Sequence, residues 1–262
     1  MAKNYFELLE DFFTYIPEVS SSELDSDWVD FIDKIKRTAV ARKQTLNKDQ
    51  GFYRARILDE KKIEVHNHML KGNYLPKEKL GAPPRKESQA GRINSKGVPC
   101  LYLADEVNTA IAEIKPHLGA HINVAKFELI RNIEVVDTTK NIITIEDYYK
   151  KTVDSKVTEK DEEELLWWGI GLFFSIPINP YHESTDYIGT QYLSDIFKSL
   201  GFKGIIYGSA MKKNQKNLAL FYPELAKPVG DRPEYLRIDD IHYQTNKDSL
   251  NNFVTQIKGS NP

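Results

Sequence analysis

The chain has 262 residues, of which 40% are hydrophobic and 28% are charged, and its net charge is −2. This composition is typical of a globular protein with a substantial core, and it lacks the basic excess of a general nucleic-acid binder. A single cysteine, Cys100, excludes an internal disulfide and indicates a reducing, cytoplasmic environment. We expect no membrane association, because the start resembles no secretory signal and the most apolar run, residues 165–178, is shorter than the ~20 residues of a membrane span.

The first 46 residues predict helices. Apolar residues recur at steps of three and four from Phe6 to Phe13 and again from Trp28 to Ile35, and a polar segment between them supplies caps and a turn. From residue 51 the pattern changes to short strands separated by glycine, proline and asparagine. We therefore predict a helical N-terminal appendage over residues 1–48, a main domain over 49–225, and a C-terminal strand and tail over 226–262.

The main domain is predicted to be α+β. Strands and helices mix in it without a regular βαβ rhythm, which argues against a doubly wound parallel sheet. One more strand is expected in "YLRIDDI" after residue 226. The predicted strands of the main domain cover 52–57, 99–103, 122–129, 133–137, 204–207 and 217–222, and the predicted helices cover 60–70, 105–117, 145–153, 161–175 and 186–200.

Familiar catalytic motifs are missing from the sequence. The segment "GIGLFF" at 169 lacks the third glycine of a dinucleotide fingerprint and lies in a predicted helix, and no P-loop is present. The segment around Ser209 reads "YGSAM", which is not the nucleophile elbow G-x-S-x-G. These patterns therefore assign no function.

Two histidine patterns resemble metal sites, but neither fits the predicted elements. His66 and His68 are spaced as ligands on a strand, yet their region is predicted to be helical. Glu113, His117 and His121 have helical spacing, but a proline and a glycine between them should end the helix first. No metal site is predicted.

The segment "GRINSKGVPCLYLADEVNTAIAEIKPHLG", residues 91–119, joins a loop, a strand and a helix. Asp105 is predicted to cap the helix that begins at Glu106, and Glu113 lies at the edge of the apolar stripe of that helix. An excess of lysine and arginine between residues 77 and 96 can hold a phosphate-bearing ligand. Taken alone, both features also fit a solvated surface.

Several segments in a fixed order resemble the RES domain family, which is named for its arginine, glutamate and serine. They are "FYRAR" at 52, "GAPP" at 81, "GRINSKGVPCLYLA" at 91, "AIAE" at 110, "TQYLSDIFKSLGFKGIIYGSA" at 190 and "NLALF" at 217. The resemblance implies an ADP-ribosyltransferase-like fold, with a mixed β core and flanking helices. RES proteins are known chiefly as toxins of bacterial toxin–antitoxin pairs, and characterised members consume NAD.

The resemblance implies roles for the residues that match the family. Glu113 falls on its glutamate, where a carboxylate on the ribose hydroxyls would stabilise the oxocarbenium-like state of bond cleavage. Ser209 falls on its serine and could hydrogen-bond the ribose or the carboxamide. Arg54 and Arg92 both match arginine positions and would hold the diphosphate. Which of the two is more critical stays open.

Three further residues are candidate substrate contacts. Tyr102 matches an aromatic position of the family's NAD pocket, and Tyr53 is a second candidate for stacking on a base. Asn94 would either fix its loop or contact the ligand. The chain has Ile93 where many members have a tryptophan, which should change packing beside the pocket rather than the role of Arg92.

The implied function is an NAD-consuming toxin that cleaves the nicotinamide–ribose bond by hydrolysis or phosphorolysis and depletes cellular NAD. The alternatives are a protein ADP-ribosyltransferase with the same pocket and a non-catalytic binding or regulatory module. NAD is the substrate, and no further cofactor is expected. The expected partner is a helix-turn-helix antitoxin. The acceptor of the ribosyl group, the role of the appendage and homo-oligomer formation stay open.

Overall fold

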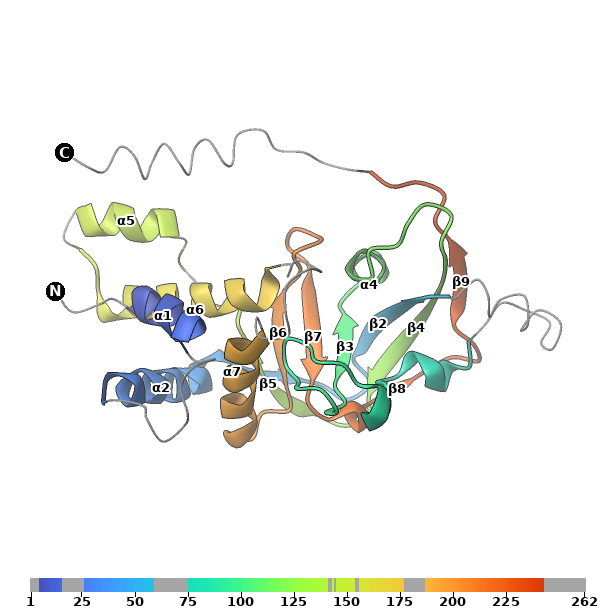
Figure 1. Cartoon of the computed structure of the whole chain (residues 1–262), viewed down its shortest axis with the longest axis horizontal. Helices are drawn as coiled ribbons and strands as arrows, with labels where there is room; N and C mark the ends of the chain where they lie inside the picture. Colours follow the sequence, from blue (N-terminus) through green and yellow to red (C-terminus); the bar gives the residue numbers. More distant parts are fainter. Residues whose placement is uncertain are drawn as a thin grey trace.

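The computed structural model describes residues 5–15, 26–58, 75–140, 143, 145–153, 156–176 and 187–242. Within them the fold is α+β, with a nine-stranded mixed sheet and flanking helices, as predicted (Figure 1). The helices are α1 (Tyr5–Tyr15), α2 (Ser26–Ala39), α4 (Val107–Glu113), α5 (Ile145–Val153), α6 (Glu159–Ser175) and α7 (Ile188–Ser199). The strands are β1 (Lys43–Leu46), β2 (Gly51–Ile57), β3 (Leu101–Ala104), β4 (His121–Leu129), β5 (Ile133–Asp137), β6 (Gly204–Gly208), β7 (Lys216–Leu220), β8 (Ala226–Pro228) and β9 (Glu234–Arg237).

The sheet consists of two parts that meet at β2 and β3. Its order is β1-β5-β6-β7-β3-β2-β4-β8, and β9 also pairs with β4. Strands β5 and β6 are parallel, and the other recorded pairs are antiparallel. β2 pairs with β4 along its whole length, but its register with β3 is limited to Tyr53 opposite Ala104. The sheet therefore separates beyond this point, between two strands that both carry predicted site residues.

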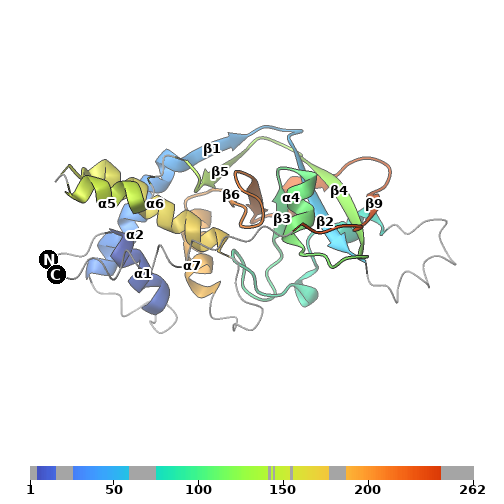
Figure 2. The ribbon, with the colours of Figure 1, turned by 90° about the horizontal axis from the view of Figure 1, so that it is seen from above.

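The N-terminal helices pack into the main core. Helix α1 contacts α6 and α7, and α2 contacts α7. Figures 1 and 2 show these helices together at one end of the molecule, with α4 apart from them beside β2 and β3. The buried apolar cluster at this end joins Leu9, Phe12 and Phe31 to Trp167 and Phe197, so the periodicity seen in the first 46 residues marks core positions.

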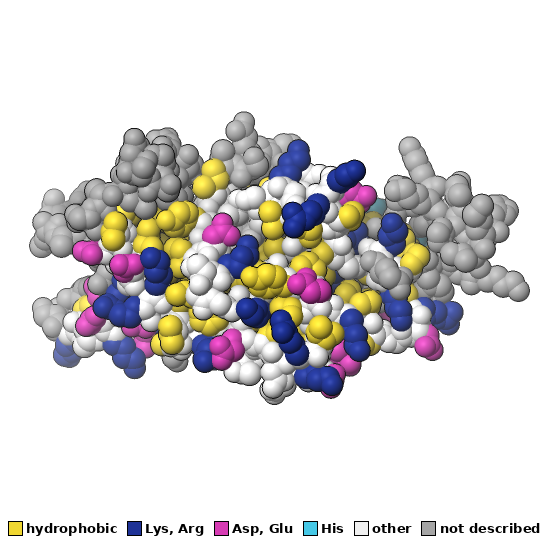
Figure 3. Space-filling model, turned by 90° about the horizontal axis from the view of Figure 1, so that it is seen from below, with side chains coloured by type: hydrophobic (Ala, Val, Ile, Leu, Met, Phe, Trp, Pro, Cys, Tyr) yellow, Lys and Arg dark blue, Asp and Glu magenta, His cyan; other side chains and the backbone are white. Residues whose placement is uncertain are grey.

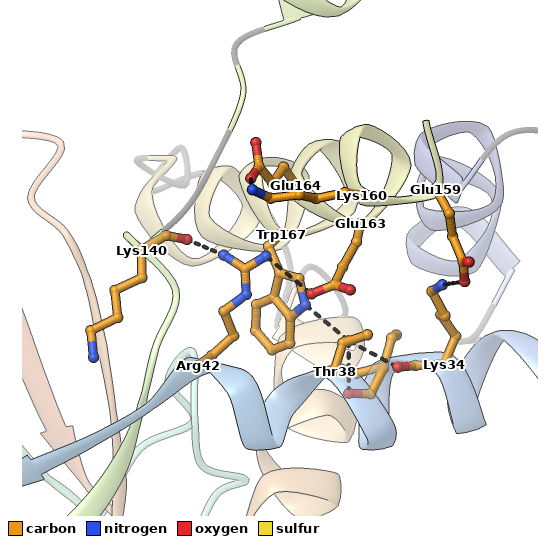
Figure 4. A network of polar contacts seen from close by, with 10 residues as sticks. Lys34, Thr38, Arg42, Lys140, Glu159, Lys160, Glu163, Glu164 and Trp167 are labelled. Carbon is orange, nitrogen blue, oxygen red and sulfur yellow. Dashed lines mark hydrogen bonds and ion pairs between the residues drawn. The ribbon is translucent and has the colours of Figure 1, made fainter. Parts of the chain in front are cut away.

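A polar network also fixes the N-terminal segment to α6 (Figure 4). The guanidinium of Arg42 is 2% exposed, lies 5.2 Å from the ring centroid of Trp167, donates to the carbonyl of Lys140, and approaches Glu163 at 3.5 Å. The indole Nε1 of Trp167 donates to Thr38 Oγ1 at 3.0 Å. Burial lowers the pKa of Arg42, an effect that Glu163 opposes. The network joins α2, the turn after it and α6 into one unit.

Most predicted elements occur close to their expected bounds. The strands predicted in the main domain lie within two residues of β2 to β7, and three of its helices match α5, α6 and α7 equally well. The helix predicted at 60–70 falls outside the described residues. Sequence patterns missed β1 and β8, which are short edge strands with little alternation.

The predictions for helix α4 were wrong at both ends. The helix begins two residues later than expected and ends at Glu113, four residues early, where Lys115 adopts a positive φ of 45° just before Pro116. The N-cap residue is Glu106, and no side chain caps it. Asp105 instead accepts a hydrogen bond from the backbone N–H of Lys216 at 2.9 Å, so it joins β7 to the start of the helix.

Candidate functional site

A cavity of about 300 Å³ opens where β2 and β3 separate beneath α4. Its volume is at the lower end of the range for small-molecule sites, about 300–1,000 Å³. Strands β2, β3, β6 and β7, helix α4 and the loop before β3 all contribute to its wall. The lining residues are Tyr53, Arg54, Ala55, Gly91, Arg92, Tyr102, Leu103, Ala104, Ala110, Glu113, Ile114, Tyr187, Tyr207 and Asn217.

Glu113 supplies the carboxylate of the cavity. It is the last residue of α4, whose buried side chains Thr109 and Ala110 orient the helix. Its Oε1 accepts hydrogen bonds from Ser209 Oγ at 2.7 Å and from Asn217 Nδ2 at 2.6 Å. The predicted glutamate and serine, 96 residues apart, are therefore in direct contact. Ser209 reaches the cavity through Glu113 and does not line it.

Arg54 supplies a partly buried positive charge on β2. Burial, together with the charge of Arg56, lowers its pKa to about 10. Its Nη1 donates to the carbonyl of Tyr102 at 3.1 Å. No acidic side chain among the described residues forms an ion pair with it. An anionic group in the cavity would stabilise this cation, because opposite charges interact strongly where water is excluded.

Arg92 lies on a tight loop over the other side of the cavity. Its Nη1 donates to the carbonyl of Phe174 in the last turn of α6, where the helix dipole favours a positive charge. Gly91 and Asn94 form an isolated bridge across the loop. Gln191 Nε2 on α7 donates to both of their carbonyls, each at 2.9 Å. The arginine is thus held by two helices that lie far from it in the sequence.

Tyr102 lines the cavity and also anchors the loop of Arg92. Its hydroxyl donates to Asn94 Oδ1 at 2.8 Å and accepts from the backbone N–H of Ile93 at 3.2 Å. Burial raises the pKa of Tyr102, so the hydroxyl keeps its proton. Asn94 is buried and is not part of the cavity wall, and its contacts with Tyr102 hold the loop. Tyr53 lines the cavity, and its stacking role stays a prediction.

Sequence reasoning missed Tyr187, Tyr207 and Asn217 in the cavity wall. Asn217 stands in "NLALF" at the start of an apolar strand, and a polar residue in a buried strand was the available signal. Tyr207 is likewise a polar residue in an apolar strand, "GIIYG". Burial raises the pKa of Tyr207, and the nearby charge of Arg92 opposes this effect. Of the basic residues between 77 and 96, Arg92 alone lines the cavity among the described residues, so the local charge excess does not form a phosphate site as a group.

The histidine patterns do not form a metal cluster in the part of the chain that is described. No group of three or more His, Cys, Asp or Glu side chains there is arranged to hold a metal ion. His121 contacts the hydroxyl of Tyr235 on β9, and His66 and His68 lie outside the described residues. None of the described helices is both long enough and apolar enough to cross a membrane.

Comparison with known proteins assigns the family. One solved structure found in the comparison is the crystal structure of the M. tuberculosis MbcT–MbcA toxin–antitoxin complex, at 13% identity and a TM-score of 0.38, covering 78% of this chain and 92% of that one. No curated protein matches. The model of the RES domain matches residues 71–239, which begin after β2 and contain Arg92, Tyr102, Glu113 and Ser209. Since this match spans well over half of the sequence, the chain belongs to the RES domain family.

Proposed function

We propose that the chain is an enzyme that cleaves the nicotinamide–ribose bond of NAD, with water or phosphate as the acceptor, and that it acts as the toxin of a toxin–antitoxin pair. The observation that carries the proposal is the pairing of charges in one cavity. Arg54 and Arg92 present guanidinium groups, and Glu113 presents a carboxylate held by Ser209 and Asn217. NAD carries an anionic diphosphate, which the guanidinium groups can bind. Its ribose becomes cationic during cleavage, and the carboxylate can stabilise that charge.

The two arginines suit the diphosphate of NAD. Each guanidinium can donate two parallel hydrogen bonds to a pair of phosphate oxygens, which gives both affinity and orientation. Arg54 is partly buried without an ion-pair partner among the described residues, and a phosphate would supply its counter-charge. The rings of Tyr53, Tyr102 and Tyr207 line the same cavity and offer faces for the nicotinamide ring.

Glu113 suits the ribose. As the C1′–N bond breaks, its electron pair leaves with the nicotinamide nitrogen, and positive charge develops on C1′ and the ring oxygen. A carboxylate that accepts hydrogen bonds from the ribose hydroxyls stabilises this charge. The acceptor oxygen then forms the new bond to C1′, and water as acceptor loses a proton to solvent. The orientation of Glu113 by protein donors before substrate arrives removes a reorganisation cost from this step.

The experiment is an incubation of the purified chain with NAD, followed by chromatographic measurement of released nicotinamide. We expect release by the wild type and a loss of about two orders of magnitude in rate for Glu113→Ala, in keeping with the loss of a group that stabilises transition-state charge. Glu106→Ala is the matched control, because Glu106 is an exposed glutamate at the start of the same helix. No release by the wild type, under conditions where a known NAD-consuming enzyme is active, would refute the proposal.

Mass spectrometry of the product distinguishes the acceptors. ADP-ribose indicates water, ADP-ribose 1″-phosphate indicates phosphate, and label from NAD retained on a macromolecule indicates a protein ADP-ribosyltransferase. The last result would keep the cavity assignments and replace the proposed reaction.

The toxin role is tested in cells. We expect induced expression of the wild type to lower NAD and arrest growth, and expression of Glu113→Ala to do neither. The family resemblance further supports a helix-turn-helix antitoxin, encoded beside this chain, as the partner. Its co-expression should restore NAD and growth, whereas unimpaired growth with full wild-type expression would contradict the toxin role.

A further inference from the structure

The two oxygens of the Glu113 carboxylate are not equivalent. Oε1 accepts from both Ser209 Oγ and Asn217 Nδ2, at 2.7 and 2.6 Å. No hydrogen bond to Oε2 is found from any described residue. A carboxylate with one oxygen held by two donors cannot rotate freely, so its second oxygen has a defined direction. Because Glu113 lines the cavity, the free oxygen is the one available to a ligand.

Asn217 is built rigidly into the sheet. It lies on β7 with Ala104 of β3 opposite it on one side and Tyr207 of β6 on the other, and it is 4% exposed. Only the amide nitrogen of an asparagine can donate to a carboxylate, so Nδ2 must face Glu113. A buried amide in a central strand needs a partner, and Glu113 provides it. The bond spans 104 residues of sequence and joins α4 to the sheet.

The hydroxyl of Ser209 acts both as a hydrogen-bond donor and as an acceptor. It donates its proton to Glu113 and accepts from the backbone N–H of Met211 at 3.1 Å. The backbone N–H of Ser209 donates to the carbonyl of Gln215 at 2.8 Å, which closes the loop between β6 and β7. A hydroxyl with these bonds is suited to holding the carboxylate in one orientation.

We propose that Asn217 is a positioning residue for Glu113 and that it acts together with Ser209. Both donors bind Oε1 and thereby direct Oε2 to the ribose hydroxyls. This inference rests on the proposed cleavage of NAD for its kinetic consequence, but the hydrogen bond itself can be measured without substrate. Asn217 acts by orienting Glu113, so it need not contact the substrate itself.

The kinetic test is a double-mutant cycle. We expect Asn217→Ala to lower kcat by roughly ten- to hundredfold, the value of a hydrogen bond to a charged group, with KM changed far less. In a Glu113→Ala background the same substitution should have no further effect on kcat, because the group it positions is gone. Asn217→Asp keeps the side-chain shape but replaces the donor by a second carboxylate, and we expect it to lose at least as much activity as Asn217→Ala.

Asn123→Ala is the matched control for folding. Asn123 is a buried asparagine on β4 that accepts from the backbone N–H of Leu75 and does not line the cavity. Its loss should lower the unfolding midpoint while kcat stays unchanged. If Asn217→Ala lowered kcat as much in the Glu113→Ala background as in the wild type, the positioning role would be wrong.

A spectroscopic test separates this inference from the proposed function. The side-chain amide of Asn217 should give a shifted signal in a ¹⁵N–¹H spectrum of the full chain without substrate, as expected for a donor to a carboxylate. Glu113→Ala should move this signal strongly, and Glu106→Ala should leave it in place. A chain that cleaves no NAD but shows this response would refute the proposed reaction and keep the positioning contact. A signal unaffected by Glu113→Ala would refute the contact whatever the activity.

Discussion

Arg54 is a partly buried arginine with no acidic partner among the described residues. Its pKa falls from the ordinary value of an arginine to about 10, because burial disfavours the charged form. Because this pKa is lowered in the folded state, the charged form of Arg54 lowers the free energy of unfolding at every pH below about 10, including neutral pH. A residue that weakens the fold in this way is expected where a ligand supplies the missing charge.

We predict opposite effects of Arg54→Met on stability and on binding. The free energy of unfolding should stay equal or rise by about 1–2 kcal/mol, because an apolar side chain replaces a buried charge. Affinity for ADP-ribose, which carries the diphosphate, should fall roughly ten- to hundredfold. Urea unfolding and calorimetric titration measure the two effects. Arg56→Met is the control, since Arg56 donates to the carbonyl of Gly81 and lies outside the cavity wall; an equal loss of affinity there would contradict the assignment.

Gly91 is required by its neighbours in space. A Cβ at this position would lie 2.6 Å from the hydroxyl oxygen of Tyr102 and 2.9 Å from Asn94 Oδ1, inside the contact that holds the loop. We predict that Gly91→Ala lowers the free energy of unfolding by about 1–3 kcal/mol, through overpacking, and displaces Arg92. Tyr102→Phe removes one of the clashing atoms, so adding it to Gly91→Ala should recover part of the loss in thermal unfolding. If the double variant lost as much stability as the two single variants together, the clash would not be the cause.

At the scale of elements, α6 connects the N-terminal segment to the cavity. Its first turn carries a capping box between Thr158 and Asp161, and its middle buries Trp167 against Arg42 and Thr38. Its last turn presents the carbonyl of Phe174 to Arg92. The acidic first turn of α6 therefore begins the helix whose other end orients Arg92.

The capping box leads to a prediction about acid stability. Hydrogen bonds from Lys151 and Thr158 lower the pKa of Asp161 from its ordinary value to about 2. A carboxylate with a lowered folded-state pKa contributes stability above its unfolded pKa and loses it as the pH falls through the folded one. Asp161→Asn should therefore be less stable than the wild type at pH 6, and the difference should shrink between about pH 4 and pH 2. Urea unfolding across this range tests it, and a difference independent of pH would contradict it.

At the scale of the whole molecule, helices gather at one end of the sheet and the cavity opens in its middle, where β2 and β3 separate. The face in Figure 3 carries Lys and Arg side chains interspersed with hydrophobic and acidic ones. Such mixing agrees with a net charge of −2. The N-terminal segment supplies core side chains and the edge strand β1, which pairs with β5.

The predicted division at residue 48 can be tested by truncation. A chain that begins at residue 49 lacks α1, α2 and β1, and with them the buried side chains Leu9, Phe12, Phe31, Ile35 and Leu46. Because their loss exposes a large apolar surface, we expect the truncated chain to be poorly soluble and to lack a cooperative thermal transition. Soluble yield, near-UV circular dichroism and thermal unfolding measure this. A cooperative transition at the wild-type temperature would establish an autonomous domain.

The periodicity of apolar residues determined most elements without any structure, because a helix or strand shows its pattern within its own residues. It placed α5, α6, α7 and the strands from β2 to β7 closely. It failed where contacts outside the segment decide the outcome. The edge strand β1 exists because β5 lies beside it, and Asp105 bonds Lys216 rather than capping α4.

The candidate site divides in the same way. The sequence by itself determined which residues to consider, since the matched segments contain Arg54, Arg92, Tyr102, Glu113 and Ser209. Only the tertiary structure decided how they meet: Ser209 holds the carboxylate, Asn94 holds the loop, and Asn217 binds Glu113 across 104 residues. The physical reason is that a hydrogen bond between distant segments depends on strand order and register, and neither leaves a pattern within either segment.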